Sequence, residues 1–163
     1  MWRRSRLPTM KATKCKEVLS RLAGKRLATA ESLTGGGIGA AITGTPGASK
    51  VYAGGIISYT NAVKHRLLGV PLEDLERFGA VSAPVAQAMA RGAKNALQAD
   101  AAVSVTGLAG PDGDEFGNPV GTVFIGYADE AHEFAREYHF EGNRENVREQ
   151  TILAALDLVL EYN

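Results

Sequence analysis

Residues 27–40 read Leu27-Ala28-Thr29-Ala30-Glu31-Ser32-Leu33-Thr34-Gly35-Gly36-Gly37-Ile38-Gly39-Ala40, and this stretch decides the fold. It begins as a short apolar strand, breaks at a cluster of hydroxyl groups and glycines, and resumes as a helix of small residues. A turn from strand to helix directs the first N–H groups of the helix into the turn, and glycine lets another molecule approach the backbone closely. Because Ser32 lies in that turn, a nucleophile and an oxyanion site can coincide there.

Length and composition limit the classes of function. The chain has 163 residues, enough for one domain with a full hydrophobic core. Its 18 Lys and Arg residues balance 18 Asp and Glu residues. This balance argues against nonspecific electrostatic binding to nucleic acid or to an anionic membrane. The single cysteine, Cys15, excludes an intrachain disulfide and a cysteine-rich metal site, and it favours the reducing cytoplasm.

Hydrophobic periodicity and turn residues predict alternating helices and strands. Helices are predicted over 11–23, 35–43, 61–68, 72–78, 83–98 and 143–162, and strands over 27–30, 51–60, 101–105, 119–127 and 133–140. Asn61 and Ser82 are the predicted caps of the helices that they begin. This order predicts an α/β fold, namely a three-layer α/β/α sandwich around a mixed, mostly parallel sheet with a C-terminal hairpin. Residues 1–10 are predicted to be a disordered tail or an upstream false start, and residues 11–163 a single domain.

Several familiar motifs are absent from the sequence despite its 19 glycines. Residues 44–50 lack the Gly-Lys-Ser/Thr ending of a phosphate loop, and the glycines of residues 35–39 lack the spacing and the acidic partner of a dinucleotide turn. No Gly-x-Ser-x-Gly elbow occurs. The histidines show neither a triad nor the ligand spacing of a catalytic zinc site: His65, His132 and His139. We therefore expect no metal and no other cofactor.

Three segments rich in glycine and polar residues follow predicted strands, at residues 32–36, 59–64 and 106–111. In an open α/β sheet the carboxyl ends of parallel strands meet at one edge, where ligands bind. The three segments are therefore predicted to converge. From spacing alone a second interpretation stays open, in which these residues cap helices or contact solvent: Ser32, Thr34, Asn61 and Lys64.

The ordered segments resemble a known family. They are Glu31-Ser32-Leu33-Thr34-Gly35-Gly36, Tyr59-Thr60-Asn61-Ala62-Val63-Lys64, Gly79-Ala80-Val81-Ser82, Val103-Ser104-Val105-Thr106-Gly107-Leu108-Ala109-Gly110-Pro111 and Pro119-Val120-Gly121-Thr122-Val123. This pattern resembles the CinA C-terminal domain family, also called PncC, over nearly the whole chain from residue 11. The chain is similar to the stand-alone form of the family. It departs from the usual pattern at Leu33, at Thr60 and in a more acidic loop over 112–116.

The resemblance implies hydrolysis of the carboxamide of nicotinamide mononucleotide to nicotinic acid mononucleotide and ammonia, a step of pyridine nucleotide recycling. The family is described as using a serine/lysine arrangement. Carried onto this sequence, this implies Ser32 as the nucleophile and Lys64 as the base, with Tyr59 nearby to relay a proton or orient the amine. Lys64 acts as a base only when neutral, so its pKa must fall from about 10.4 through burial or nearby cations.

Further residues are candidates for substrate binding. The N–H groups near Thr34, Gly35 and Gly36 are expected to hold the oxyanion. The other two polar segments add three candidate contacts: Asn61, Thr106 and Gly107.

The substrate phosphate requires a cation or a helix N-terminus. Arg144 and Arg148 lie one turn apart on the last predicted helix, so they can face one partner. In a second interpretation, these two arginines form ion pairs with neighbouring glutamates on an exposed face. The pair Ser49 and Lys50 is another candidate for binding the phosphate.

The competing class of function is a non-catalytic ligand-binding or interaction module of the competence/damage-inducible CinA type. The joint presence of Ser32, Tyr59 and Lys64 favours the enzyme. The expected partner is a small nucleotide substrate, with no nucleic acid and no membrane. A homo-oligomer is predicted, with the helix over 35–41 or the edge of the hairpin as its interface.

Overall fold

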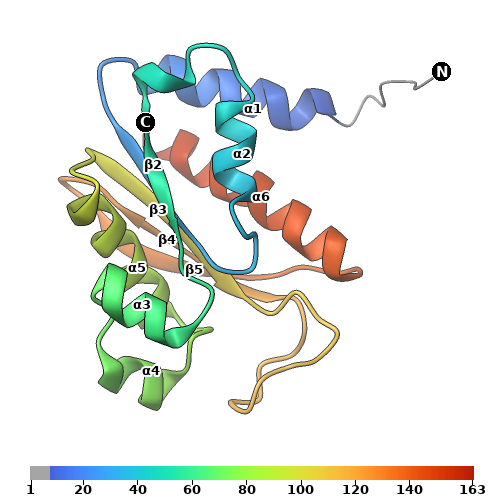
Figure 1. Cartoon of the computed structure of the whole chain (residues 1–163). Coiled ribbons are helices and arrows are strands. Elements are labelled where there is room, and N and C mark those ends of the chain that lie inside the picture. The colour runs from blue at the N-terminus through green and yellow to red at the C-terminus, as the bar shows by residue number, and fades with distance from the viewer. Residues whose placement is uncertain (1–7) are drawn as a thin grey trace.

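The computed structural model describes residues 8–163, and residues 1–7 of the predicted tail lie outside the described part (Figure 1). Six α-helices, one short 3₁₀ helix and five strands follow one another: α1 (Pro8–Arg21), β1 (Leu27–Glu31), α2 (Gly37–Thr43), η1 (Ala48–Lys50), β2 (Tyr52–Ile57), α3 (Asn61–Leu68), α4 (Leu72–Phe78), α5 (Ala83–Ala96), β3 (Ala101–Gly107), β4 (Thr122–Ala128), β5 (Glu133–His139) and α6 (Arg144–Glu161). The types and order agree with the prediction. The first helix begins at Pro8 rather than residue 11, so residues 8–10 are helical.

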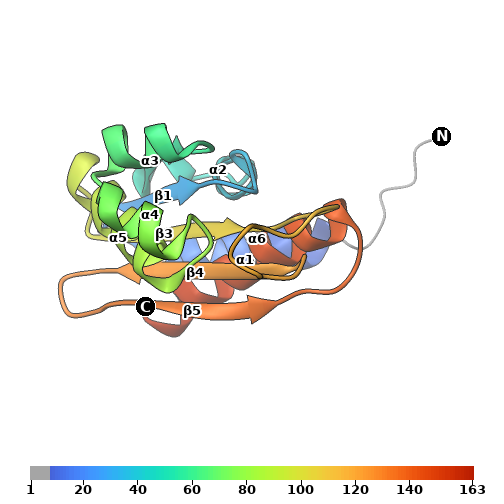
Figure 2. The ribbon, with the colours of Figure 1, turned by 90° about the horizontal axis from the view of Figure 1, so that it is seen from below.

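The five strands form one mixed sheet in the order β2-β1-β3-β4-β5. β1 pairs in parallel with β2 and β3, whereas β4 is antiparallel to both β3 and β5. Helices α1, α2 and α6 cover one face, and α3, α4 and α5 lie on the other (Figure 2). The predicted three-layer α/β/α sandwich with its C-terminal hairpin is therefore confirmed. No helix within residues 8–163 combines the length and the apolar character needed to cross a membrane.

The alternation of side chains along the central strands divides the core between the two faces. Leu27 and Val103 pack into the cluster beneath α1, α2 and α6, whereas Ala28 and Ala102 pack against α5 on the other side. The residues facing α5 are small, so this helix lies close to the sheet backbone. At Gly126 of β4, an added Cβ would overlap the carbonyl oxygen of Ala86 on α5.

We expect Gly126→Ala to lower the free energy of unfolding by about 1–3 kcal/mol, because overpacking displaces a helix that already contacts the sheet backbone. Thermal and urea denaturation measure this loss. An unchanged melting temperature would contradict the close contact of α5 with β4.

One predicted helix cap is wrong, and the other holds in position without the expected side-chain hydrogen bond. Helix α3 is capped by Thr60, whose hydroxyl accepts a hydrogen bond from Val63 N, and Asn61 is the first helical residue. Ser82 is the N-cap residue of α5, as predicted, but its hydroxyl donates to Gly79 O and accepts from no helical amide. In both cases the loop before the helix decides which hydroxyl reaches which backbone group.

The register of the parallel strands positions the site. Glu31, the last residue of β1, lies beside Ile57 of β2 and Val105 of β3. The chain therefore leaves all three strands at the same edge of the sheet, as the sequence predicts.

Candidate active site

The side chains of Ser32 and Lys64 meet at this edge. Ser32 directly follows β1, and Lys64 lies in the first turn of α3 with only 1 % of its surface exposed. Lys64 Nζ lies 3.1 Å from Ser32 Oγ, 2.7 Å from Ser58 O and 3.3 Å from Tyr59 O. The interpretation of Lys64 as a solvated side chain is therefore wrong.

Burial without a charged partner changes the protonation of this amine. Within the described part of the chain, the three hydrogen-bond partners of Lys64 are uncharged oxygens, and desolvation lowers its pKa from the usual 10.5 to about 8. A neutral amine has two N–H groups and one lone pair. The two carbonyls of Ser58 and Tyr59 can take the N–H groups, which leaves the lone pair for the Ser32 hydroxyl proton. This arrangement suits a general base.

A buried carboxylate holds the loop of residues 32–36, which we call the nucleophile loop after the role predicted for Ser32. Glu31 is 2 % exposed, and its carboxylate accepts hydrogen bonds from Thr34 Oγ1 (2.6 Å), Ile38 N (2.8 Å) and Gly39 N (3.0 Å). The interpretation of the Ser32 and Thr34 side chains as caps of α2 is wrong, because the Glu31 carboxylate accepts from the second and third helical amides. Sequence reasoning missed this role. The available signal was an acidic residue directly before a turn that opens a helix.

We expect Glu31→Ala to lower the free energy of unfolding by about 2–4 kcal/mol, because it leaves the buried N–H of Ile38 and the partly buried N–H of Gly39 without an acceptor. Glu31→Gln, which keeps one acceptor oxygen, should lose less. Urea denaturation of the two variants measures the difference. An alanine variant as stable as the parent would contradict the capping role.

The backbone of the nucleophile loop offers fewer free donors than predicted. Gly35 and Gly36 adopt left-handed φ values of 59° and 102°, which lets the chain turn from strand to helix. The N–H group of Gly35 donates to Ser32 O at 3.1 Å, so its predicted oxyanion role is wrong in this arrangement. Within residues 8–163, the N–H groups of Leu33, Thr34 and Gly36 have no hydrogen-bond partner, and of these three residues Leu33 alone lines the cavity beside Ser32. These N–H groups are the candidate oxyanion donors.

The Ser32–Lys64 pair opens into a cavity of about 330 Å³. Its walls come from the ends of β1 and β3, the start of α3 and the start of α6, including Tyr59, Thr106, Gly107 and Arg144. Thr106 Oγ1 donates to Ala80 O at 2.9 Å, which ties the wall to the loop before α5. Asn61 does not line this cavity and lies in a neighbouring hollow beside Phe116.

Tyr59 contributes its backbone to Lys64 rather than its hydroxyl. Its side chain is 62 % exposed, and the hydroxyl lies 3.5 Å from Nη2 of Arg144. The hydroxyl hydrogen-bonds to neither Ser32 nor Lys64. The predicted direct proton relay through the Tyr59 hydroxyl is therefore wrong for this arrangement.

The two candidate arginines of α6 do not face one partner. Arg144 lines the cavity, and its Nη1 donates to Gly110 O at 2.6 Å. Arg148 lies outside the cavity walls and donates to Leu33 O and Thr34 O of the nucleophile loop. Neither arginine forms an ion pair with a neighbouring glutamate in the described part of the chain, where Glu149 pairs with Lys11. The first turn of α6 therefore contacts the loop after β3, whereas its second turn contacts the loop after β1.

The other phosphate candidate, Ser49 with Lys50, lies in η1 before β2, at the opposite end of the parallel strands. This candidate is therefore wrong as part of a site around Ser32.

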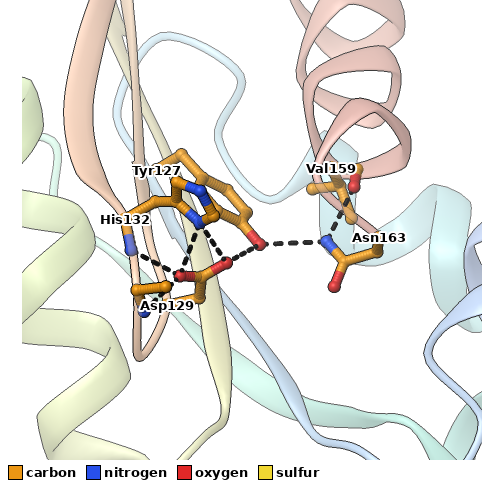
Figure 3. A network of polar contacts seen from close by, with 6 residues as sticks. Tyr127, Asp129, His132, Val159 and Asn163 are labelled. Carbon is orange, nitrogen blue, oxygen red and sulfur yellow. Dashed lines mark hydrogen bonds and ion pairs between the residues drawn. The ribbon is translucent and has the colours of Figure 1, made fainter.

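The histidines form no site with Ser32. His65 Nδ1 bonds to Val70 O, and His139 pairs with Glu137. Figure 3 shows His132 in the β4–β5 turn beside Asp129, whose Oδ2 also accepts a hydrogen bond from the Tyr127 hydroxyl at 2.9 Å. This network closes the hairpin against the C-terminal end of α6, far along the sheet from Ser32.

Comparisons with known proteins identify the family of the chain. Residues 10–163 match the model of the family described as the CinA C-terminal domain. A Pseudomonas putida protein named nicotinamide-nucleotide amidohydrolase PncC is 47% identical over 153 residues, which cover 94% of this chain and 95% of that protein. A CinA-like protein of Geobacter metallireducens is 49% identical over 139 residues, or 85% of this chain, but this chain spans only 34% of its length.

Solved structures agree with the fold. A CinA superfamily protein of Escherichia coli has a TM-score of 0.92 at 32% identity, covering 99% of this chain and 95% of that chain. A competence/damage-inducible protein of Agrobacterium tumefaciens has a TM-score of 0.90 at 35% identity, covering 93% and 94%.

Proposed function

Because the chain belongs to the family of the CinA C-terminal domain, we propose that it hydrolyses the carboxamide of nicotinamide mononucleotide to nicotinic acid mononucleotide and ammonia. The name of the Pseudomonas putida relative, which matches over nearly the full length of both chains, supports this substrate. The observation that carries the proposal is the hydrogen bond between buried Lys64 and Ser32 in a cavity. A neutral lysine beside a serine is an arrangement that activates a hydroxyl for acyl transfer.

In the proposed acylation step, Ser32 Oγ attacks the carboxamide carbon while its proton moves to Lys64 Nζ. The carbonyl oxygen becomes an oxyanion, which the N–H groups of Thr34 and Gly36 stabilise. Protonated Lys64 then donates its proton to the amide nitrogen. The C–N bond breaks, ammonia leaves, and the nicotinoyl group, which still carries the ribose phosphate, is held as an ester of Ser32.

In the proposed deacylation step, water attacks the ester carbon and gives a proton to Lys64. The ester bond breaks, Lys64 returns that proton to Ser32 Oγ, and nicotinic acid mononucleotide leaves. The carbonyls of Ser58 and Tyr59 keep the amine directed at Ser32 throughout. Every proton transfer in this path uses side chains of this chain and water.

For the substrate phosphate we propose Arg144 as the binding cation, since its guanidinium group lines the cavity that contains Ser32. Its Nη2 group lies beside the exposed Tyr59 hydroxyl at the mouth of the cavity. We further propose a cytoplasmic location, which the single cysteine favours. The homo-oligomer stays a prediction that light scattering can test.

The experiment is incubation of the purified chain with nicotinamide mononucleotide, followed by an ammonia assay and chromatography of the nucleotide product. We expect ammonia and nicotinic acid mononucleotide in equal amounts. Binding of the nucleotide without ammonia release would overturn the proposal and favour the non-catalytic module.

A further inference from the structure

A guanidinium group outside the cavity holds the backbone of the nucleophile loop. Arg148 lies in the second turn of α6, and it donates from Nε to Leu33 O at 2.9 Å and from Nη2 to Thr34 O at 3.2 Å. We propose that Arg148 is a positioning residue that fixes this loop for the attack of Ser32 and does not bind the substrate phosphate. The inference deepens the proposed amidohydrolase function and rests on it.

The nucleophile loop needs support from outside. Its two left-handed glycines, Gly35 and Gly36, lose more conformational freedom on ordering than other residues. Two side chains of opposite charge hold the loop through hydrogen bonds. The Glu31 carboxylate holds the Thr34 hydroxyl and the start of α2, while the Arg148 guanidinium holds the carbonyls of the two residues that follow Ser32. A planar guanidinium presents its N–H groups in a rigid fork, here Nε to one carbonyl and Nη2 to the next, whereas a lysine amine is a single point on a flexible stem.

Fixing these carbonyls also fixes a candidate oxyanion donor. A trans peptide unit is planar, so its N–H points opposite to its C=O. Because Leu33 O faces Arg148, the N–H of Thr34 in the same peptide unit points away from the guanidinium. This N–H has no partner within the described residues. The cation at the carbonyl end polarises the peptide unit, which makes the N–H a stronger donor to a developing oxyanion.

Arg144 provides the contrast within the same helix. It lies one turn earlier and lines the cavity, whereas Arg148 is absent from the cavity walls. Arg148 instead lies against the loop itself, where its Nη2 would be 3.8 Å from a Cβ added at Gly35. Loss of Arg148 should therefore affect turnover, and loss of Arg144 should affect substrate binding.

The test compares Arg148→Met, Arg148→Lys and the matched control Arg144→Met in steady-state kinetics with nicotinamide mononucleotide, at a temperature where all variants are folded. We expect Arg148→Met to lower kcat by about 10- to 100-fold with KM nearly unchanged, because a misplaced nucleophile affects the transition state more than the ground state. Arg148→Lys should recover little of the loss. Arg144→Met should mainly raise KM.

Chemical rescue separates positioning from a general loss of stability. In Arg148→Ala, added guanidinium ion should partly restore kcat by occupying the vacated place. A raised KM with unchanged kcat in Arg148→Met would overturn the proposal in favour of phosphate binding. A lowered melting temperature with unchanged kcat would overturn it in favour of a purely structural role.

A measurement without substrate keeps this inference distinct from the proposed function. Hydrogen–deuterium exchange of the amides in residues 32–36 should be faster in Arg148→Met than in the parent, and unchanged in Arg144→Met. If the parent releases no ammonia from nicotinamide mononucleotide, the proposed function fails, and the exchange result alone then decides whether Arg148 fixes the loop. Unchanged exchange in Arg148→Met would overturn the inference.

Discussion

Ser32→Ala is expected to reduce ammonia release from nicotinamide mononucleotide by about 10⁴-fold or more, because the residue that forms the proposed covalent intermediate is lost. The methyl side chain fits where the hydroxymethyl group was, so the fold should be kept. The measurement is kcat from ammonia production, together with circular dichroism and thermal unfolding of the same sample.

A matched control exists in the same sheet. Ser104 is a fully buried serine of β3 whose hydroxyl donates to Ala86 O, away from Lys64. Ser104→Ala should lose some stability and keep its turnover, which would separate the loss of a buried hydroxyl from the loss of a nucleophile. Turnover by Ser32→Ala near that of the parent would contradict the assignment of Ser32.

Lys64→Met and Lys64→Arg are both expected to lose activity by about 10³-fold or more, since neither side chain can accept the Ser32 proton at neutral pH. In the parent, kcat/KM should rise with pH through a midpoint at about 8, where burial places the pKa of Lys64. The value rises rather than falls with pH because only the neutral amine acts as a base. A flat pH profile, or retained activity in Lys64→Arg, would indicate another base.

The same pKa shift links stability to pH. The folded state holds the pKa of Lys64 at about 8, below the usual 10.5 of the unfolded chain. Between these two values the unfolded state binds more protons, so the free energy of unfolding should rise with pH, by a total of about 3 kcal/mol. Comparison of urea denaturation of the parent and Lys64→Met between pH 7 and pH 10.5 isolates this contribution, because the variant lacks it.

Local patterns in the sequence determined most of the architecture. The apolar periodicity predicts the helices and strands, and the strand–turn–helix at residues 27–40 predicts a sheet whose polar turns meet at one edge. The proximity of Ser32 and Lys64 follows from that topology, since Ser32 comes directly after β1 and Lys64 lies in the first turn of the helix that follows the neighbouring parallel strand β2. The identity of the chemistry, in contrast, rests on the family resemblance, because spacing alone left helix caps and a solvated lysine open.

The tertiary structure alone decided which polar groups meet. Helical spacing shows that Arg144 and Arg148 share a face, but not that Arg144 reaches the cavity while Arg148 reaches the nucleophile loop. The same holds for Glu31, whose carboxylate caps a helix that begins six residues later. A side-chain hydrogen bond depends on distances and angles within a few tenths of an ångström. These are set by how α2 and α6 pack on the sheet, which no local pattern encodes.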